Sequence, residues 1–177
     1  RKNSLLCNSQ YHYNTLSDMI QTQKHRKKSS ENYNLILTDS FAISRTCHIQ
    51  TIKKYNKTYH LLLCGEIYNR KELLRIIPES DVTEADDAEL LLLSYLSYGE
   101  ASFVIPKGCF SFALIIEEEH CIYLVRDALG CKPVFYSMKD DTFLFGTEPK
   151  ALLAHPIIEA AADLTCLREL LLIGPAH

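Results

Sequence analysis

The stretch Leu61–Arg75, which reads LLLCGEIYNRKELLR, contains the change of pattern that decides the fold. An unbroken apolar run, typical of a buried strand, stops at Cys64–Glu66. A helical pattern follows over Arg70–Ile77, and Pro78 would end that helix. We interpret Gly65 as a tight turn between strand and helix, because glycine readily adopts positive φ. A second interpretation is functional: a glycine at a strand end exposes a main-chain N–H that can bind a developing oxyanion.

Strand and helix patterns continue outward from this stretch in both directions. The predicted strands are Tyr33–Thr38, Phe41–Ile49, Tyr59–Cys64, Cys109–Glu117, Cys121–Arg126, Val134–Ser137 and Thr142–Gly146. The predicted helices are Leu16–His25, Arg70–Ile77, a helix opened by a capping sequence at Thr83–Asp86 that runs to Tyr98, Glu148–Leu153, and a helix capped by Asp163 that runs to Leu172. We expect the last four strands to form an antiparallel meander. This order predicts the α+β class, with two stacked antiparallel sheets and helices outside them.

The composition fits a single globular domain of 177 residues, of which 47% are hydrophobic and 23% are charged. The net charge of −3 does not indicate a nucleic-acid-binding protein, and no apolar run approaches the ~20 residues of a membrane span. Seven cysteines occur without any C-x-x-C pair, so their spacing predicts no zinc site. The odd number of cysteines and the lack of a signal peptide favour a cytoplasmic location.

Four longer motifs follow one another in a fixed order. They are GEIYN at Gly65–Asn69, GCFSFAL at Gly108–Leu114, RDALGCKPVFY at Arg126–Tyr136 and FGTEPKALLAHP at Phe145–Pro156. Together they resemble the class II glutamine amidotransferase domain of the glutamine-hydrolysing asparagine synthetase family. The resemblance covers the chain from Tyr59 to its C-terminus and is weak before that residue.

The resemblance implies an N-terminal-nucleophile hydrolase fold, a four-layer αββα sandwich of two stacked antiparallel sheets. It also implies a reaction in which an N-terminal cysteine thiolate takes the side-chain acyl group of glutamine as a thioester. Ammonia then passes through a tunnel to an ATP-dependent synthetase domain. We expect residues 1–177 to be the glutaminase-like domain, with the synthetase domain outside this chain. We expect no cofactor or metal in this domain, since ATP and Mg belong to the synthetase domain, and we include a homodimer among the expected partners.

The resemblance also assigns roles to individual residues. Asp87 stands where the family binds the α-amino group of glutamine, and Glu66 would support the same ammonium end. Arg45 stands where an arginine holds the α-carboxylate in a bidentate pair. Gly65 would donate its main-chain N–H to the oxyanion. Structural alternatives remain: Asp87 can pair with a helix dipole, and Arg45 can be an ordinary surface residue of a strand.

Several positions depart from the family pattern. Cys64 replaces an asparagine whose side chain is the second oxyanion donor, and losing one such donor typically costs ~3–4 kcal/mol, or about 100- to 1000-fold in rate. The run Arg26–Ser29 replaces an R-G-P-D turn, and residue one is Arg1 where the family has the nucleophile. This matters because the free α-amine of the nucleophile serves as its base. Cys7 lacks the glycine and isoleucine that should follow it, and Cys64 as a relocated nucleophile has no base nearby in sequence.

Three hypotheses follow from these observations. The first is an active glutaminase domain whose opening residues are not in this sequence. The second is a catalytically impaired relative that serves as a scaffold, as in β-lactam synthetases and lasso-peptide cyclases of the same superfamily. The third is an amino-acid-binding domain without catalysis. The replacement at Cys64 and the altered turn favour impaired chemistry, while the family resemblance is unaffected.

Overall fold

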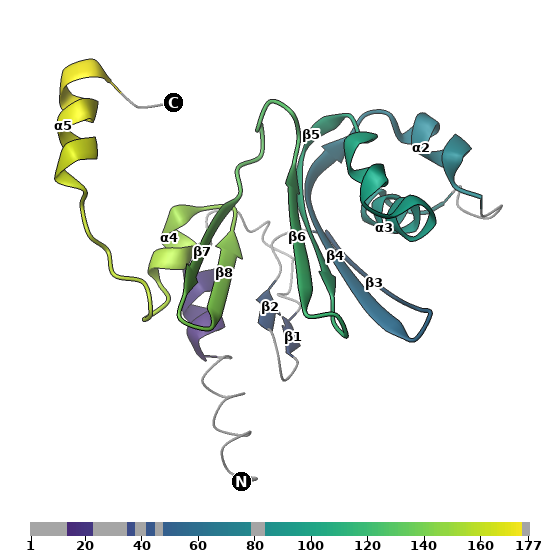
Figure 1. The fold of residues 1–177 in the computed structure, drawn as a ribbon, viewed down its shortest axis with the longest axis horizontal. Coiled ribbons are helices and arrows are strands. Elements are labelled where there is room, and N and C mark those ends of the chain that lie inside the picture. The colour runs from purple at the N-terminus through teal and green to yellow at the C-terminus, as the bar shows by residue number, and fades with distance from the viewer. Residues whose placement is uncertain (1–13, 23–34, 38–41, 45–47, 79–83, 175–177) are drawn as a thin grey trace, which may run out of the picture.

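The centre of the fold is a four-stranded antiparallel sheet with the strand order β3-β4-β5-β6 (Figure 1). Its strands are β3 (His48–Lys54), β4 (Lys57–Ile67), β5 (Gly108–Ile116) and β6 (Cys121–Arg126). The computed structural model describes residues 14–22, 35–37, 42–44, 48–78 and 84–174. The two central strands are the longest and carry near-continuous apolar runs, because both of their faces are covered.

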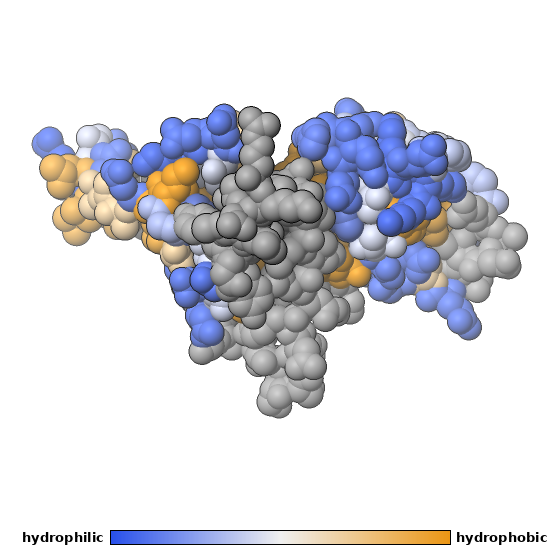
Figure 2. Space-filling model, turned by 90° about the horizontal axis from the view of Figure 1, so that it is seen from below, coloured by the Kyte–Doolittle hydropathy of each residue, from blue (hydrophilic) through white to orange (hydrophobic). Residues whose placement is uncertain are grey.

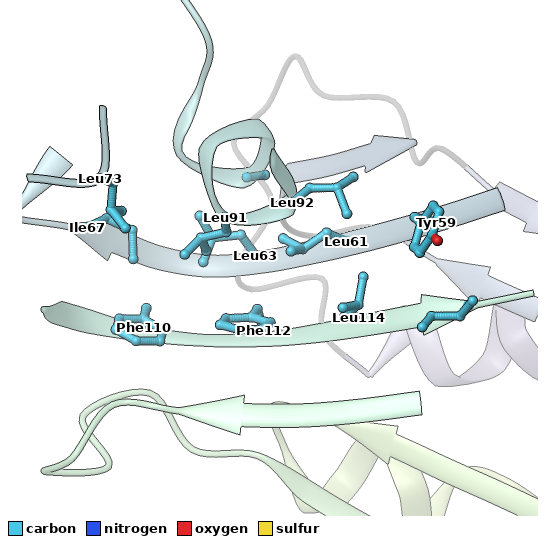
Figure 3. Packing of buried hydrophobic residues seen from close by; sticks show 12 residues of the cluster. Tyr59, Leu61, Leu63, Ile67, Leu73, Leu91, Leu92, Phe110, Phe112 and Leu114 are labelled. Atoms are coloured by element: carbon cyan, nitrogen blue, oxygen red, sulfur yellow. The ribbon is translucent and has the colours of Figure 1, made fainter. Parts of the chain in front are cut away.

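One face of this sheet is covered by α2 (Arg70–Ile76) and α3 (Asp87–Tyr98), with the 3₁₀ helix η2 (Gly99–Val104) next to α3. Alternate residues of the strands point into this layer, and Figure 3 shows them facing the leucines of α3. The cluster contains Tyr59, Leu61, Leu63, Ile67, Leu73, Leu91, Leu92, Phe110, Phe112 and Leu114. Each fully buried side chain of this kind contributes ~1.5–3 kcal/mol, so this layer supplies much of the stability.

The opposite face of the sheet packs against a second layer of strands. The residues Leu62, Ala113 and Ile115 point to this side, where Phe145 of β8 packs against them. The hairpin β7 (Phe135–Lys139) and β8 (Thr142–Gly146) lies there, and α4 (Pro149–Leu153) covers its outer side (Figure 1). The order of layers is therefore α4, hairpin, central sheet, and α2 with α3. This arrangement confirms the predicted α+β sandwich of stacked antiparallel sheets with helices outside.

Most predicted elements are present, with four corrections. The single strand predicted over Phe41–Ile49 is replaced by β2, which pairs with β1, and by β3, which belongs to the central sheet and runs on to Lys54. The strand expected to end at Cys64 continues to Ile67 as part of β4. The four C-terminal strands do not form one meander, because β5 and β6 pair within the central sheet whereas β7 and β8 form a separate hairpin. The N-cap of α3 is Asp86 and not Thr83, the first residue of the predicted capping sequence. The Asp86 carboxylate accepts the N–H of Glu89.

The N-terminal part of the chain contributes a helix over 14–21 and a small sheet of two strands, β1 (Leu35–Leu37) and β2 (Ala42–Ser44). The helix begins two residues before the predicted range 16–25, of which residues 23–25 fall outside the described residues. Both short strands fall within the segments predicted as strands.

The last helix, α5 (Leu164–Ile173), stands apart from the layers (Figure 1). Its cap is the predicted one, because Asp163 accepts the N–H of Thr165 at 2.8 Å. Figure 2 shows a hydrophobic surface over this helix, where five leucines are exposed: Leu164, Leu167, Leu170, Leu171 and Leu172. A surface this apolar is unusual for a part of the chain that touches only water.

Among the described residues, no helix combines the length and the hydropathy that crossing a membrane requires.

Candidate functional site

Gly65 lies inside β4, opposite Phe110 of β5, and not in a turn after the strand as its sequence context predicted. Its φ of 114° is one that other residues rarely adopt, and a Cβ at this position would lie 2.1 Å from the carbonyl oxygen of Cys109. Glycine is therefore required by close packing of two strands. The expectation of positive φ was right, but its cause is the approach of β5.

The hydrogen-bond alternation of the sheet determines where the Gly65 N–H points. Tyr68 donates its N–H to the carbonyl of Lys107 on the β5 side, so the residue before it, Ile67, faces the other way. Accordingly, the Ile67 N–H donates to Asp87. Gly65 lies two residues before Ile67, so its N–H points to the same side of β4. Its partner Phe110 bonds through its N–H and its carbonyl to Asp127, on the β6 side, and not to Gly65. The N–H of Gly65 is thus assigned to the edge of β4 that faces away from β5.

That edge is not covered by β3 among the described residues, because the pairing of β3 with β4 extends only to Leu63. The N–H groups of Gly65 and Ile67 therefore emerge from the same side of β4, two residues apart. Two residues of a strand span ~6.8 Å. This spacing places a main-chain donor and the Asp87 carboxylate side by side along one edge.

Asp87 is held by two groups that the sequence did not connect. Its Oδ2 accepts the Ile67 N–H at 3.0 Å, and its Oδ1 accepts Nη1 of Arg70 at 2.9 Å. Arg70 also donates to the carbonyl oxygen of Ala85, just before α3. These contacts join the end of β4, the start of α2 and the start of α3. A carboxylate has about four acceptor sites, so Asp87 retains capacity for a further donor.

Glu66 and Cys64 lie on the face of the sheet opposite α3. The alternation along β4 places them on the side of Leu62, away from the cluster that contains Leu63 and Ile67. In the register with β5, Cys64 lies opposite Ser111 and Glu66 lies opposite Cys109. The Glu66 side chain is exposed, whereas Cys64 is half-buried. Acidic and thiol groups therefore gather on this face near the Gly65 edge.

The segment after β6 closes this end of the sheet. The Asp127 carboxylate is buried and accepts the N–H groups of Phe110, Leu129 and Cys131 at 2.9–3.2 Å. Loss of hydration raises the pKa of Asp127, but hydrogen bonds from Cys131, Leu129 and Phe110 outweigh it and hold the pKa below its ordinary value. The turn is thereby tied to β5, directly beside the strand that packs on Gly65.

One group of side chains in the described part of the chain has donor atoms spaced as a metal site would need. The Sγ atoms of Cys109 and Cys131 and a carboxylate oxygen of Asp127 lie within 4.8 Å of one another. Sequence spacing did not indicate it, because these residues are brought together by strand pairing.

Four of the five residues selected from the sequence lie at one end of β4, with Cys64 and Glu66 on the face opposite α3 and Asp87 at the edge of the strand. Cys64, Gly65 and Glu66 are consecutive on β4, and Asp87 reaches the same strand end through Ile67. Arg45 lies outside the described residues, as do Arg1, Cys7 and the run 26–29. Two residues that position the site were missed: Arg70 and Asp127. Only the Asp-x-Leu-Gly sequence at Asp127, typical of a side chain that caps its own turn, pointed to either of them.

Comparison with known proteins shows which sequences this chain resembles. A sequence model described as a glutamine amidotransferase domain matches residues 6–176. Asparagine synthetase [glutamine-hydrolyzing] 3 of Bacillus subtilis (strain 168) is 38% identical over 122 residues, covering 68% of this chain and 20% of that protein. Asparagine synthetase [glutamine-hydrolyzing] 2 of the same organism is 26% identical over 150 residues, covering 81% of this chain and 20% of that protein. Carboxyethyl-arginine beta-lactam-synthase of Streptomyces clavuligerus is 35% identical over 94 residues, covering 53% of this chain and 18% of that protein. The chain spans about a fifth of the length of these curated relatives.

Proposed function

Since this chain belongs to the glutamine amidotransferase domain family, we propose that it is the glutamine-binding domain of an asparagine-synthetase-type protein. In this proposal the domain hydrolyses glutamine to glutamate and supplies ammonia for asparagine biosynthesis, at a rate reduced by the replacement of one oxyanion donor. The observation that carries the proposal is the shared edge of β4. There the N–H groups of Gly65 and Ile67 lie two residues apart on the same side of the strand, and the Asp87 carboxylate accepts the N–H of Ile67.

The amino end of glutamine would bind at Asp87. This carboxylate already accepts two hydrogen bonds, which fix its orientation, and it retains room for an ammonium donor. Glu66, exposed near the same strand end, adds negative charge that favours a cation there. Arg45 is proposed to hold the α-carboxylate, as the resemblance implies.

The side-chain amide of glutamine would then extend along the edge toward Gly65. The two N–H positions are ~6.8 Å apart, a span that an extended glutamine side chain can bridge. The Gly65 N–H would donate to the oxyanion of the tetrahedral intermediate. Cys64 occupies the position of the second donor, and a thiol donates weakly. We therefore propose catalysis about 100- to 1000-fold slower than with an amide at this position.

The ammonia released would need an acceptor domain. The relatives named asparagine synthetase are about five times longer than the part that this chain matches, which supports an ATP-dependent synthetase domain as the partner. ATP and Mg are proposed for that domain and not for this one. The exposed leucines of α5 supply an apolar surface at the C-terminal end of the described residues. We place the protein in the cytoplasm and keep a homodimer as a further proposed assembly.

A second candidate is a non-catalytic scaffold or amino-acid-binding domain of a synthetase that uses no glutamine-derived ammonia. Two observations favour it. Cys64 removes the amide donor beside Gly65, and one relative is named a β-lactam synthase and not an asparagine synthetase. The two candidates differ in whether glutamine is cleaved.

The test combines binding with turnover. Glutamine binding is measured by calorimetry, and glutamate release is measured by a coupled assay, in the full-length native protein. A diazoketone analogue of glutamine then labels any nucleophilic thiol, which peptide mapping locates. Glutamate release together with a labelled N-terminal cysteine establishes the first candidate. Glutamine binding without release or labelling establishes the second, and the absence of binding contradicts both.

Asp87→Asn and Asp141→Asn form a matched pair for this test. Both remove one carboxylate charge, but Asp141 lies in the exposed turn between β7 and β8. We expect Asp87→Asn to weaken glutamine binding at least ~10-fold, the equivalent of one charge-assisted hydrogen bond, and Asp141→Asn to leave it unchanged. Equal affinities in the two variants would remove Asp87 from the proposed site.

A further inference from the structure

Two cysteines that are distant in sequence meet beside the candidate site. Cys109 lies at the start of β5 and is half-buried, whereas Cys131 follows the turn after β6 and is exposed. Their Sγ atoms are at most 4.8 Å apart, and a carboxylate oxygen of Asp127 lies within the same limit of each. Both thiols are reduced in the structure. A disulfide needs an S–S distance of ~2.05 Å, so the two side chains must rotate toward each other before a covalent bond can form.

The backbone holds the two thiols together. The N–H of Cys131 donates to Oδ1 of Asp127 at 3.2 Å, and Oδ2 of the same carboxylate accepts the N–H of Phe110 at 3.2 Å. The Asp127 N–H in turn donates to the carbonyl of Phe110 at 3.0 Å. The main-chain N–H groups of Cys131 and of Phe110, which follows Cys109, therefore donate hydrogen bonds to the same Asp127 side chain. The proximity of the thiols follows from this network and not from a chance contact of exposed side chains.

The same network argues against a metal ion as the main occupant. A carboxylate has about four acceptor sites. Three of those on Asp127 are used by the main-chain donors Phe110, Leu129 and Cys131. A structural zinc ion needs four protein ligands, and two thiolates with a largely committed carboxylate do not supply them. The two sulfurs are therefore the reactive part of the cluster.

We propose that Cys109 and Cys131 form a redox-active dithiol, which a small-molecule disulfide oxidises to an intramolecular disulfide. The exposed thiolate of Cys131 attacks one sulfur of the oxidant, forming a mixed disulfide and releasing one thiolate of the oxidant. The thiolate of Cys109 then attacks Sγ of Cys131, forming the protein disulfide and releasing the second thiolate. The two protons from the cysteines end on the two released thiols. The protein sulfurs are oxidised, and the disulfide reagent is reduced.

The order of attack follows from exposure, because of the two residues Cys131 is exposed and Cys109 is half-buried. Loss of hydration, then the Cys109 thiol and the Asp127 charge, raise the pKa of Cys131 above its ordinary value. Cys131 is therefore a thiol at neutral pH, which slows the first attack. This dithiol is independent of the proposed glutamine chemistry, since neither sulfur takes part in it.

The test exposes the full chain to glutathione disulfide and maps the products by mass spectrometry without reduction. We expect one peptide pair joined through Cys109 and Cys131, and an intact mass lower by about two hydrogen atoms. Cys109→Ser should stop at the mixed disulfide of Cys131 with glutathione, because the resolving thiol is gone. Cys166→Ser is the matched control, since it removes an exposed thiol on α5 and should leave the cross-link unchanged. Far-UV circular dichroism confirms that each variant is folded, and Cys109→Ala replaces Cys109→Ser if the serine variant is not.

Two results would overturn the inference. One is glutathione attached at Cys166 while Cys109 and Cys131 remain free thiols in the same sample. The other is stoichiometric binding of zinc to the reduced chain that Cys131→Ser abolishes, with no cross-link under oxidation. That second result would identify the cluster as a metal site.

Discussion

The carboxylate of Asp87 accepts the main-chain N–H of Ile67 at 3.0 Å and so joins the first turn of α3 to the last residue of β4. These residues are far apart in sequence, and the same carboxylate also pairs with Arg70 at 2.9 Å. One side chain therefore connects the strand that carries the candidate oxyanion donor to both helices on that face of the sheet.

Removing this connection should destabilise the fold. Asp87→Ala leaves the Ile67 N–H and the Arg70 guanidinium without their shared acceptor, and hydrogen bonds to charged groups contribute about 1.5–3 kcal/mol each. Because both side chains are partly exposed, we expect a loss of about 2 kcal/mol in total. Urea unfolding followed by circular dichroism measures it, with Asp141→Ala in the exposed hairpin turn as the control. Equal midpoints for the two variants would contradict the assignment.

Gly65→Ala should destabilise the protein more than Gly99→Ala. Both glycines have positive φ, for which an alanine costs about 1–2 kcal/mol. At Gly99 the new Cβ meets nothing within 4 Å, whereas at Gly65 it would lie 2.1 Å from the carbonyl oxygen of Cys109. Overpacking of this kind adds about 1–3 kcal/mol. Thermal unfolding of the two variants compares them directly, and a smaller effect at Gly65 would show that β4 and β5 do not approach this closely.

Cys64→Asn should increase glutamate release in a protein that carries an active nucleophile. An asparagine amide beside Gly65 supplies a second donor to the oxyanion, worth about 100-fold or more in kcat. Cys166→Asn makes the same chemical change on α5, far from the candidate site, and should leave kcat unchanged. An unchanged rate in Cys64→Asn would place the oxyanion elsewhere.

Acid should weaken the turn that contains Asp127. The pKa of this carboxyl is lowered in the folded state, since hydrogen bonds from Cys131, Leu129 and Phe110 outweigh its loss of hydration. A lowered pKa contributes stability that is present above the unfolded value of about 3.9 and is lost as pH falls through the folded value. We therefore expect Asp127→Asn to be less stable than the parent at pH 7 and to show a shallower loss of stability below about pH 4. Unfolding curves between neutral and acidic pH test this sign.

The leucines of α5 should make the chain self-associate when it is studied alone. Leu164 and Leu171 are 77% and 78% exposed, and such apolar patches bind other apolar surfaces. Replacing both by lysine should reduce the binding of a dye that reports exposed apolar surface, and should reduce the light scattering that reports self-association. Leu129→Lys, at a position 89% exposed in the turn after β6, is the control that should change neither.

Local periodicity was enough to predict most elements of this fold. The strands and helices followed from apolar alternation and from caps such as Asp163, which act within a few residues. The end of β4 was predicted wrongly because glycine in a sequence indicates a turn more often than a close contact between strands. The pairing of β5 with β4 overrode that local preference.

The order of motifs and the residue types at Cys64, Gly65, Glu66 and Asp87 were enough to determine the family and the chemistry to look for. The tertiary structure alone decided which distant groups share contacts. Strand register brings Cys109 to Cys131 and places Glu66 opposite Cys109, and the packing of α3 on the sheet brings Asp87 to Ile67 and Arg70. Register and packing depend on the fit of whole faces, which no short stretch of sequence encodes.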